Sequence, residues 1–126
     1  MRCLTVKYLL VVTILLLNAC STSPPVKTPT LNDRFQEAAK LRLSAGDYEG
    51  AVDDYLRAAA VAGREERQGL LLQAASCLME LGEAGRAQSI LERITPPYYL
   101  SGRERQHYAI LQAQIAYSQN QPERVL

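Results

Sequence analysis

A seven-residue turn sequence that recurs along the chain constrains the fold more than any other feature. Residues 46–52 (GDYEGAV) align with residues 82–88 (GEAGRAQ) at an offset of 36, and more loosely with residues 120–126 (NQPERVL) at an offset of 38. Small or apolar residues accompany each copy at fixed distances: Phe35, Ala39 and Ala51; Leu71, Ala75 and Ala87; Ala109, Ala113 and Val125. Repetition at this period predicts equivalent units that stack on one shared core.

The pattern between the turns predicts helices. After Leu31, apolar residues recur at spacings of three and four without the alternation of a strand. Cap and breaker residues divide the sequence into helices expected over 32–44, 48–62, 64–81, 83–94 and 102–118, with a sixth beginning at Pro122. Asn32 and Asp47 are candidate N-caps, and Ser101 with Glu104 predicts a capping box. The fold class is therefore all-α.

The stretch GDYEGAVDDYLRAAA, residues 46–60, resembles the tetratricopeptide repeat, a helix–turn–helix unit of about 34 residues. Alanine at the crossing of two helices lets their axes approach closely. Arg42 departs from the family pattern because an aromatic residue is usual there. The resemblance implies a solenoid of helix pairs over residues 32–126, which we expect to be incomplete at the C-terminus.

The N-terminus has the order of a bacterial lipoprotein signal peptide. Arg2 and Lys7 precede ten uncharged residues, 8–17 (YLLVVTILLL), and Asn18 and Ala19 lead to Cys20. A run of this length is typical of a signal peptide, since a spanning helix needs about 20 apolar residues. We expect cleavage of residues 1–19 between Ala19 and Cys20 and attachment of lipid to the Cys20 thiol.

The residue that follows the expected lipidation site also predicts the cellular location of the protein. In Gram-negative bacteria, Asp after the lipidated cysteine commonly retains a lipoprotein in the inner membrane, and here that residue is Ser21. We therefore expect the outer membrane, facing the periplasm. Residues 20–31 are rich in Pro, Ser and Thr and predict a short disordered tether between the lipid and the helices.

The composition and motifs do not indicate binding to nucleic acids, metals, cofactors or small-molecule substrates. Without residues 1–19 the chain keeps 12 Lys and Arg against 13 Asp and Glu, a net charge of −1, so it lacks the basic surface that nucleic acids require. Cys77 lies in an apolar stretch and is expected in the core. No nucleotide-binding or hydrolase motif occurs, and His107 is the only histidine. We expect no enzyme, no metal, no small-molecule substrate and no cofactor apart from the covalent lipid.

Three further groups of polar and aromatic residues have structural interpretations. Asp53 and Asp54 are neighbours on a helix, so they point about 100° apart and are expected on the solvated face. His107 is expected on the surface or half-buried. Tyr98 and Tyr99 follow Pro96-Pro97 in a loop; they are candidate contacts for a protein partner, because aromatic residues are enriched at interface hot spots. The alternative is that they fold back onto the adjacent helix pair.

The combination of signal, cysteine, tether and helix pairs resembles the N-terminal part of penicillin-binding protein activators of the LpoA (LppC) family. Residues 69–126 carry the resemblance, in LLLQAASCLMELGEAGRAQSILERI and, after the proline-broken loop, RERQHYAILQAQIAYSQNQPERVL. It implies an outer-membrane lipoprotein that binds a class A penicillin-binding protein and stimulates its transpeptidase. The alternatives are another tetratricopeptide lipoprotein, such as a secretin pilotin or an outer-membrane assembly subunit, and an envelope scaffold.

Overall fold

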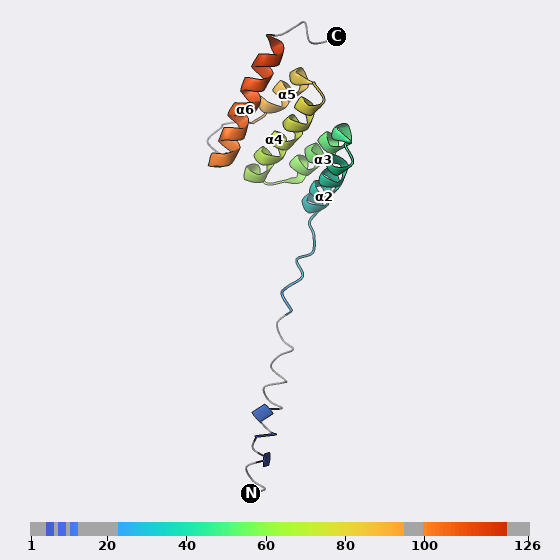
Figure 1. Ribbon diagram of the computed structural model, residues 1–126, viewed down its shortest axis with the longest axis vertical. Coiled ribbons are helices and arrows are strands. Elements are labelled where there is room, and N and C mark those ends of the chain that lie inside the picture. Colours follow the sequence, from blue (N-terminus) through green and yellow to red (C-terminus); the bar gives the residue numbers. More distant parts are fainter. Residues whose placement is uncertain (1–4, 7, 10, 13–22, 95–99, 121–126) are drawn as a thin grey trace.

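The computed structural model describes residues 5–6, 8–9, 11–12, 23–94 and 100–120, and from residue 23 onward its regular structure is entirely helical (Figure 1). The helices are α2 (Leu31–Ser44), α3 (Tyr48–Val61), α4 (Arg64–Glu80), α5 (Ala84–Leu91) and α6 (Gly102–Gln119). The prediction of an all-α chain is confirmed.

The first of these helices begins earlier than the sequence predicts. Thr30, not Asn32, is the N-cap of α2, because its hydroxyl accepts the Asp33 amide while the Asp33 carboxylate accepts the Thr30 amide in a capping box. Asn32 lies within the first turn, is buried, and accepts a hydrogen bond from the Gln36 amide at 3.1 Å. The two reciprocal hydrogen bonds satisfy more of the unpaired backbone N–H groups at the helix start than a cap at Asn32 would. This explains why the N-cap is Thr30.

The turns after α2 and α4 have the same conformation. Gly46 and Gly82 have φ values of 76° and 75°, in the left-handed region that favours glycine. The Asp47 and Glu83 amides each donate to the carbonyl five residues earlier at 2.9 Å, and the glycine amides donate to the carbonyl three residues earlier. This is a Schellman motif, and its recurrence 36 residues later confirms that the first two copies of the turn are structurally equivalent.

Four helices end differently from the prediction, and two of them, α3 and α4, end only one residue early, at Val61 and Glu80. α5 stops at Leu91 instead of Ile94, because the Arg93 and Ile94 amides donate to carbonyls three residues back and close a tighter turn. α6 begins at the predicted Ser101–Glu104 capping box and ends one residue late, at Gln119. Asn120 has a φ of −86°, so it does not reproduce the conformation of Gly46 and Gly82. The helix expected from Pro122 lies outside the described residues.

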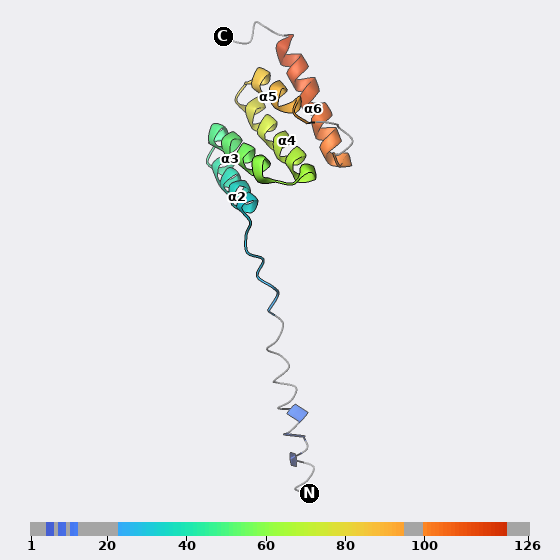
Figure 2. The same cartoon turned by 180° about the vertical axis from the view of Figure 1, so that it is seen from behind.

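Successive helices pack side by side around one core, as both views show (Figure 1, Figure 2). α3 contacts α2 and α4, and α4 also contacts α5 and α6. Six alanines of this core have no exposed surface: Ala39, Ala51, Ala58, Ala74, Ala75 and Ala87. Their small side chains allow the helices to approach, and Val52, Leu71, Leu72 and Leu78 fill the remaining space. Cys77 is buried in this core, as predicted, and burial raises the pKa of its thiol.

The described part of the third copy, helix α6, has an exposed alanine, Ala113, where the first two copies have buried Ala39 and Ala75. Ala109 and Ala113, which the alignment places at a helix crossing, are both exposed. α6 instead contacts α4 and α5 through buried Leu111 and Ile115 and half-buried Tyr108. Only one side of α6 is therefore covered within the described part of the chain.

Residues 23–30 form no helix or strand, and every one of them is exposed. They lead away from the helices toward the N-terminus (Figure 1, light blue). The described residues include no helix that is both long and apolar enough to cross a bilayer. The segment 23–30 is thus an extended approach to α2 that contributes nothing to the core.

Candidate functional site

The residues with the most specific predicted roles are not placed by the structure. Ala19 and Cys20, the expected cleavage and lipidation positions, lie outside the described residues, as do Tyr98 and Tyr99. The structure does define the flanks of the tyrosine loop, since Ile94 and Leu100 are each 3% exposed. Five residues therefore connect two anchors that are buried in the same core.

A cluster of charged side chains joins α2, the following turn and α3. The Arg42 guanidinium donates through Nε to Asp54 Oδ2 at 2.8 Å and through Nη1 to Asp47 Oδ2 at 2.7 Å. Arg57 Nη1 adds a longer contact to Asp54 Oδ1 at 3.3 Å. The Asp54 side chain is only 5% exposed, whereas that of Arg42 is 48% exposed. The cluster is therefore one buried carboxylate held by two arginines that reach it from the surface.

This cluster overturns the prediction for one of the two adjacent aspartates. Asp53 is exposed as expected, but Asp54 is buried and faces α2. A buried carboxylate needs a charged or hydrogen-bonding partner, and Arg42 supplies it from the position where the repeat family usually has an aromatic residue. Arg42 was the one signal in the sequence that could have located this partner.

The second copy of the repeat has apolar residues at the two positions where the first copy has this ion pair. At an offset of 36 residues, Leu78 occupies the place of Arg42 and Ile90 the place of Asp54. Leu78 and Ile90 are both buried in the core. An ion pair in the first helix pair is thus replaced by an apolar pair in the second.

Gly50 provides the space for the Arg42 side chain. A Cβ atom at Gly50 would collide with the Asp47 carboxylate and would lie 2.6 Å from Arg42 Nη1. The absence of a side chain here lets the guanidinium lie over the first turn of α3. The requirement at Gly50 is close approach, since its φ is not in the left-handed region.

Asp47 makes the first helix pair sensitive to acid. Its pKa is lowered below the ordinary 3.8, first by the Gly50 amide that donates to its carboxylate and then by Arg42. A carboxyl whose pKa is lower in the folded state stabilises the fold above the unfolded pKa, and this stabilisation is lost as the pH falls through the folded pKa. We expect the melting temperature of wild type to fall more between pH 5 and pH 2.5 than that of Asp47→Asn, which keeps an N-cap but does not titrate.

The comparison uses thermal unfolding followed by circular dichroism, with Asp53→Asn as the control for removing an exposed carboxylate outside the cluster. Equal falls in the melting temperature for wild type and Asp47→Asn would contradict the role assigned to this carboxylate.

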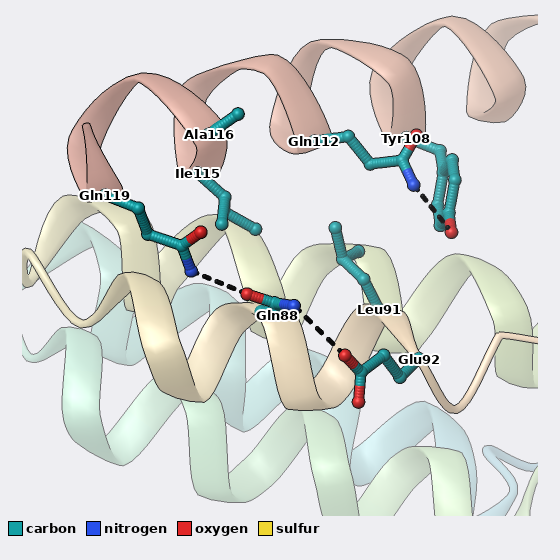
Figure 3. A pocket seen from close by; sticks show the side chains of 8 residues that line it. All are labelled: Gln88, Leu91, Glu92, Tyr108, Gln112, Ile115, Ala116 and Gln119. Atoms are coloured by element: carbon teal, nitrogen blue, oxygen red, sulfur yellow. Dashed lines mark hydrogen bonds between the residues drawn. The ribbon is translucent and has the colours of Figure 1, made fainter.

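A groove of about 250 Å³ lies between α5 and α6 (Figure 3). Its floor is apolar, with Leu91 and Ile115 pointing toward each other from the two helices (Figure 3). Amide side chains line the rim: Gln119 Nε2 donates to Gln88 Oε1 at 2.6 Å, and Gln88 Nε2 donates to Glu92 Oε1 at 3.1 Å. The first of these hydrogen bonds connects α6 to α5 across the groove, and the second runs along α5 to its C-cap, Glu92.

The groove combines an apolar floor with a rim of amides that offers both hydrogen-bond donors and acceptors. At the far end Gln112 Nε2 donates to the Tyr108 hydroxyl at 3.1 Å, which leaves its carbonyl oxygen for another partner. Sequence reasoning did not identify this groove, since glutamines spaced along two helices resemble an ordinary polar surface.

His107 Nε2 lies 2.8 Å from Ser76 Oγ, and the same serine oxygen lies 3.0 Å from the Leu72 carbonyl oxygen. The contact joins α4 to α6, and His107 is half-buried as expected. No cluster of three or more His, Cys, Asp or Glu residues suited to a metal ion occurs among the described residues.

Comparisons of the chain with protein-family models, with curated proteins and with solved structures found no match.

Proposed function

We propose that this protein is an outer-membrane lipoprotein that binds a class A penicillin-binding protein and stimulates its transpeptidase. The observation that carries the proposal is the order of elements along the chain. Residues 1–19, expected to be a signal peptide, lead to Cys20, and the exposed segment 23–30, without helix or strand, precedes the packed helix pairs. A protein of this design presents a helical surface at a distance from the membrane that holds it.

Lipid on Cys20 provides the attachment in this proposal. Each buried methylene of an acyl chain contributes about 0.8 kcal/mol, and a single chain binds only reversibly. The two or three chains of a bacterial lipoprotein therefore hold it permanently on the membrane surface. Ser21 in place of Asp favours the outer membrane.

The helix pairs are proposed to form a solenoid of the tetratricopeptide type. The equivalent turns at Gly46 and Gly82 and the fully buried alanines at the helix contacts support this arrangement. Solenoids of helix pairs use their extended surfaces to bind other polypeptides. The groove between α5 and α6 and the loop of Tyr98 and Tyr99 are the contact surfaces that we propose for the synthase.

Binding and enzyme stimulation test the proposal. The lipidated chain in detergent is expected to retain a purified class A penicillin-binding protein in a pull-down and to raise its rate of peptide crosslinking. A Tyr98→Ala/Tyr99→Ala variant is expected to weaken both effects, whereas Tyr117→Ala, which removes an exposed tyrosine from α6, leaves them unchanged. Absence of retention together with an unchanged crosslinking rate would overturn the proposed function.

A further inference from the structure

The outer face of α2 carries leucines that no other described element covers. Leu31 and Leu41 are 55% and 63% exposed, and Ala38 between them is half-buried. These three residues and Arg34 recur at the spacing of a single helix face. A hollow of about 440 Å³ lies on this face, lined by Pro29, Asp33, Arg34, Glu37, Ala38 and Leu41. α2 stands at the end of the helix stack, so the face is open (Figure 1, Figure 2).

The second copy of the repeat shows what this position on a helix binds. The residues of α4 that lie 36 positions after Arg34, Ala38 and Leu41 are Leu70, Ala74 and Cys77. None of these three is more than 4% exposed. The preceding helix, α3, packs there: burial, and then the neighbouring Cys77, raise the pKa of Tyr55 on α3. The equivalent surface of α4 therefore binds a helix, whereas residues 23–30, which precede α2, are extended and exposed.

Two charged side chains give the face of α2 a direction. Arg34 and Glu37 lie one turn apart and are exposed. Among the described residues, neither the Arg34 guanidinium nor the Glu37 carboxylate forms an ion pair. Toward the C-terminus the face presents a leucine, a positive charge, a negative charge and a second leucine. A surface with this order is complementary to its own reverse.

Two α2 helices can use this complementarity when they lie antiparallel. If Leu31 of one copy is level with Leu41 of the second copy, then Arg34 lies within one residue, or about 1.5 Å along the axis, of the level of Glu37 of the second copy. The two-fold symmetry makes this contact twice. Ala38 is small enough for the helix axes to approach. A parallel pair would instead set like charges against each other.

We infer that the face of α2 formed by Leu31, Arg34, Glu37, Ala38 and Leu41 is the docking site of α2 from a second copy of this chain, in an antiparallel two-fold pair. An occupant of this face must bring apolar side chains, a carboxylate opposite Arg34 and a cation opposite Glu37. The reversed α2 supplies all three in the required order.

The segments that lead into the two helices do not obstruct this pair. A 14-residue helix is about 21 Å long, so the N-termini of two antiparallel α2 helices lie at opposite ends of the contact. One helix face against another is a small interface, so we expect a dissociation constant in the micromolar range. The inference does not depend on the proposed function, because it uses neither the α5–α6 groove nor Tyr98 and Tyr99.

An exchange of charges between two variants tests the docking. Sedimentation velocity of the full chain in a density-matched detergent, over a range of protein concentrations, measures the dissociation constant of the dimer. We expect Arg34→Glu and Glu37→Arg each to raise this constant at least tenfold, because each change places like charges at both symmetric contacts. An equimolar mixture of the two variants is expected to associate within about threefold of wild type, because each copy supplies the charge that the other lacks.

Lys40→Glu is the matched control, since it makes the same change of charge on another side of α2 and should leave the dissociation constant unchanged. Circular dichroism checks that every variant is folded, as we expect because Arg34 and Glu37 are exposed.

Each contrary outcome overturns the inference. A dimer that neither Arg34→Glu nor Glu37→Arg weakens would place the contact on another face. Loss of the dimer in both variants without recovery in the mixture would exclude the antiparallel arrangement. A wild type that is monomeric at every concentration would exclude the second copy; if Arg34→Glu then also abolished retention of the penicillin-binding protein, the face would belong to that partner.

Discussion

A Cys20→Ala variant is expected to lose all incorporation of radiolabelled palmitate and to move from the membrane fraction to the soluble fraction. The thiol is the only group at the expected cleavage site that can carry the thioether-linked lipid. With two or three acyl chains absent, tens of methylene groups no longer enter the bilayer, each worth about 0.8 kcal/mol. The remaining chain has a net charge near zero and no basic cluster for anionic lipid, so nothing replaces the anchor.

The other two cysteines provide matched controls for this experiment. Cys3 lies in the segment expected to be removed, and Cys77 is buried in the core, so Cys3→Ala and Cys77→Ala should retain full labelling and membrane association. Unchanged labelling of Cys20→Ala would exclude Cys20 as the lipidation site. Mass spectrometry of the wild-type protein that found an intact Met1 would exclude cleavage.

An Arg42→Leu variant is expected to unfold at clearly lower urea concentration than wild type. The substitution leaves the Asp54 carboxylate buried with only Arg57, whose contact at 3.3 Å is the longer of the two. A buried carboxylate without its main partner costs about 3 kcal/mol of the free energy of unfolding. Urea unfolding followed by circular dichroism measures the loss.

The double variant Arg42→Leu/Asp54→Ile is expected to recover most of that loss. It gives the first helix pair the residues that the second has at Leu78 and Ile90, and an apolar pair in place of a buried ion pair is often neutral or stabilising. Arg57→Leu is the control, because it removes the longer contact from an arginine whose side chain is 61% exposed and should change stability little. If the double variant were as unstable as Arg42→Leu, the equivalence of the two pairs would be wrong.

Local signals in the sequence were sufficient for most of the helix boundaries. Asp47 and the Ser101–Glu104 capping box start their helices as predicted, and Gly46 and Gly82 end theirs in the left-handed conformation. These features depend on residues within one turn of each other, so they can be read from a short stretch of sequence. The start of α2 was wrong by one residue because Thr30 and Asp33 compete successfully with Asn32.

Interactions between distant residues could not be predicted in the same way. The burial of Asp54 depends on Arg42, 12 residues earlier on another helix. The groove depends on Gln88 and Gln119 approaching each other over 31 residues of sequence. Such contacts follow from how the helices pack, and the spacing of residues along one helix does not report them.

The arginine–aspartate pair between α2 and α3 also bears on how a chain with two similar halves avoids misassembly. Near-copies can exchange partners during folding, within one molecule or between two. Pairing α2 with α5 would set Arg42 against Ile90, and pairing α4 with α3 would leave buried Asp54 beside Leu78 with only the longer contact to Arg57. Because only the first helix pair contains an arginine–aspartate pair, both exchanges of helices are less stable than the native combination.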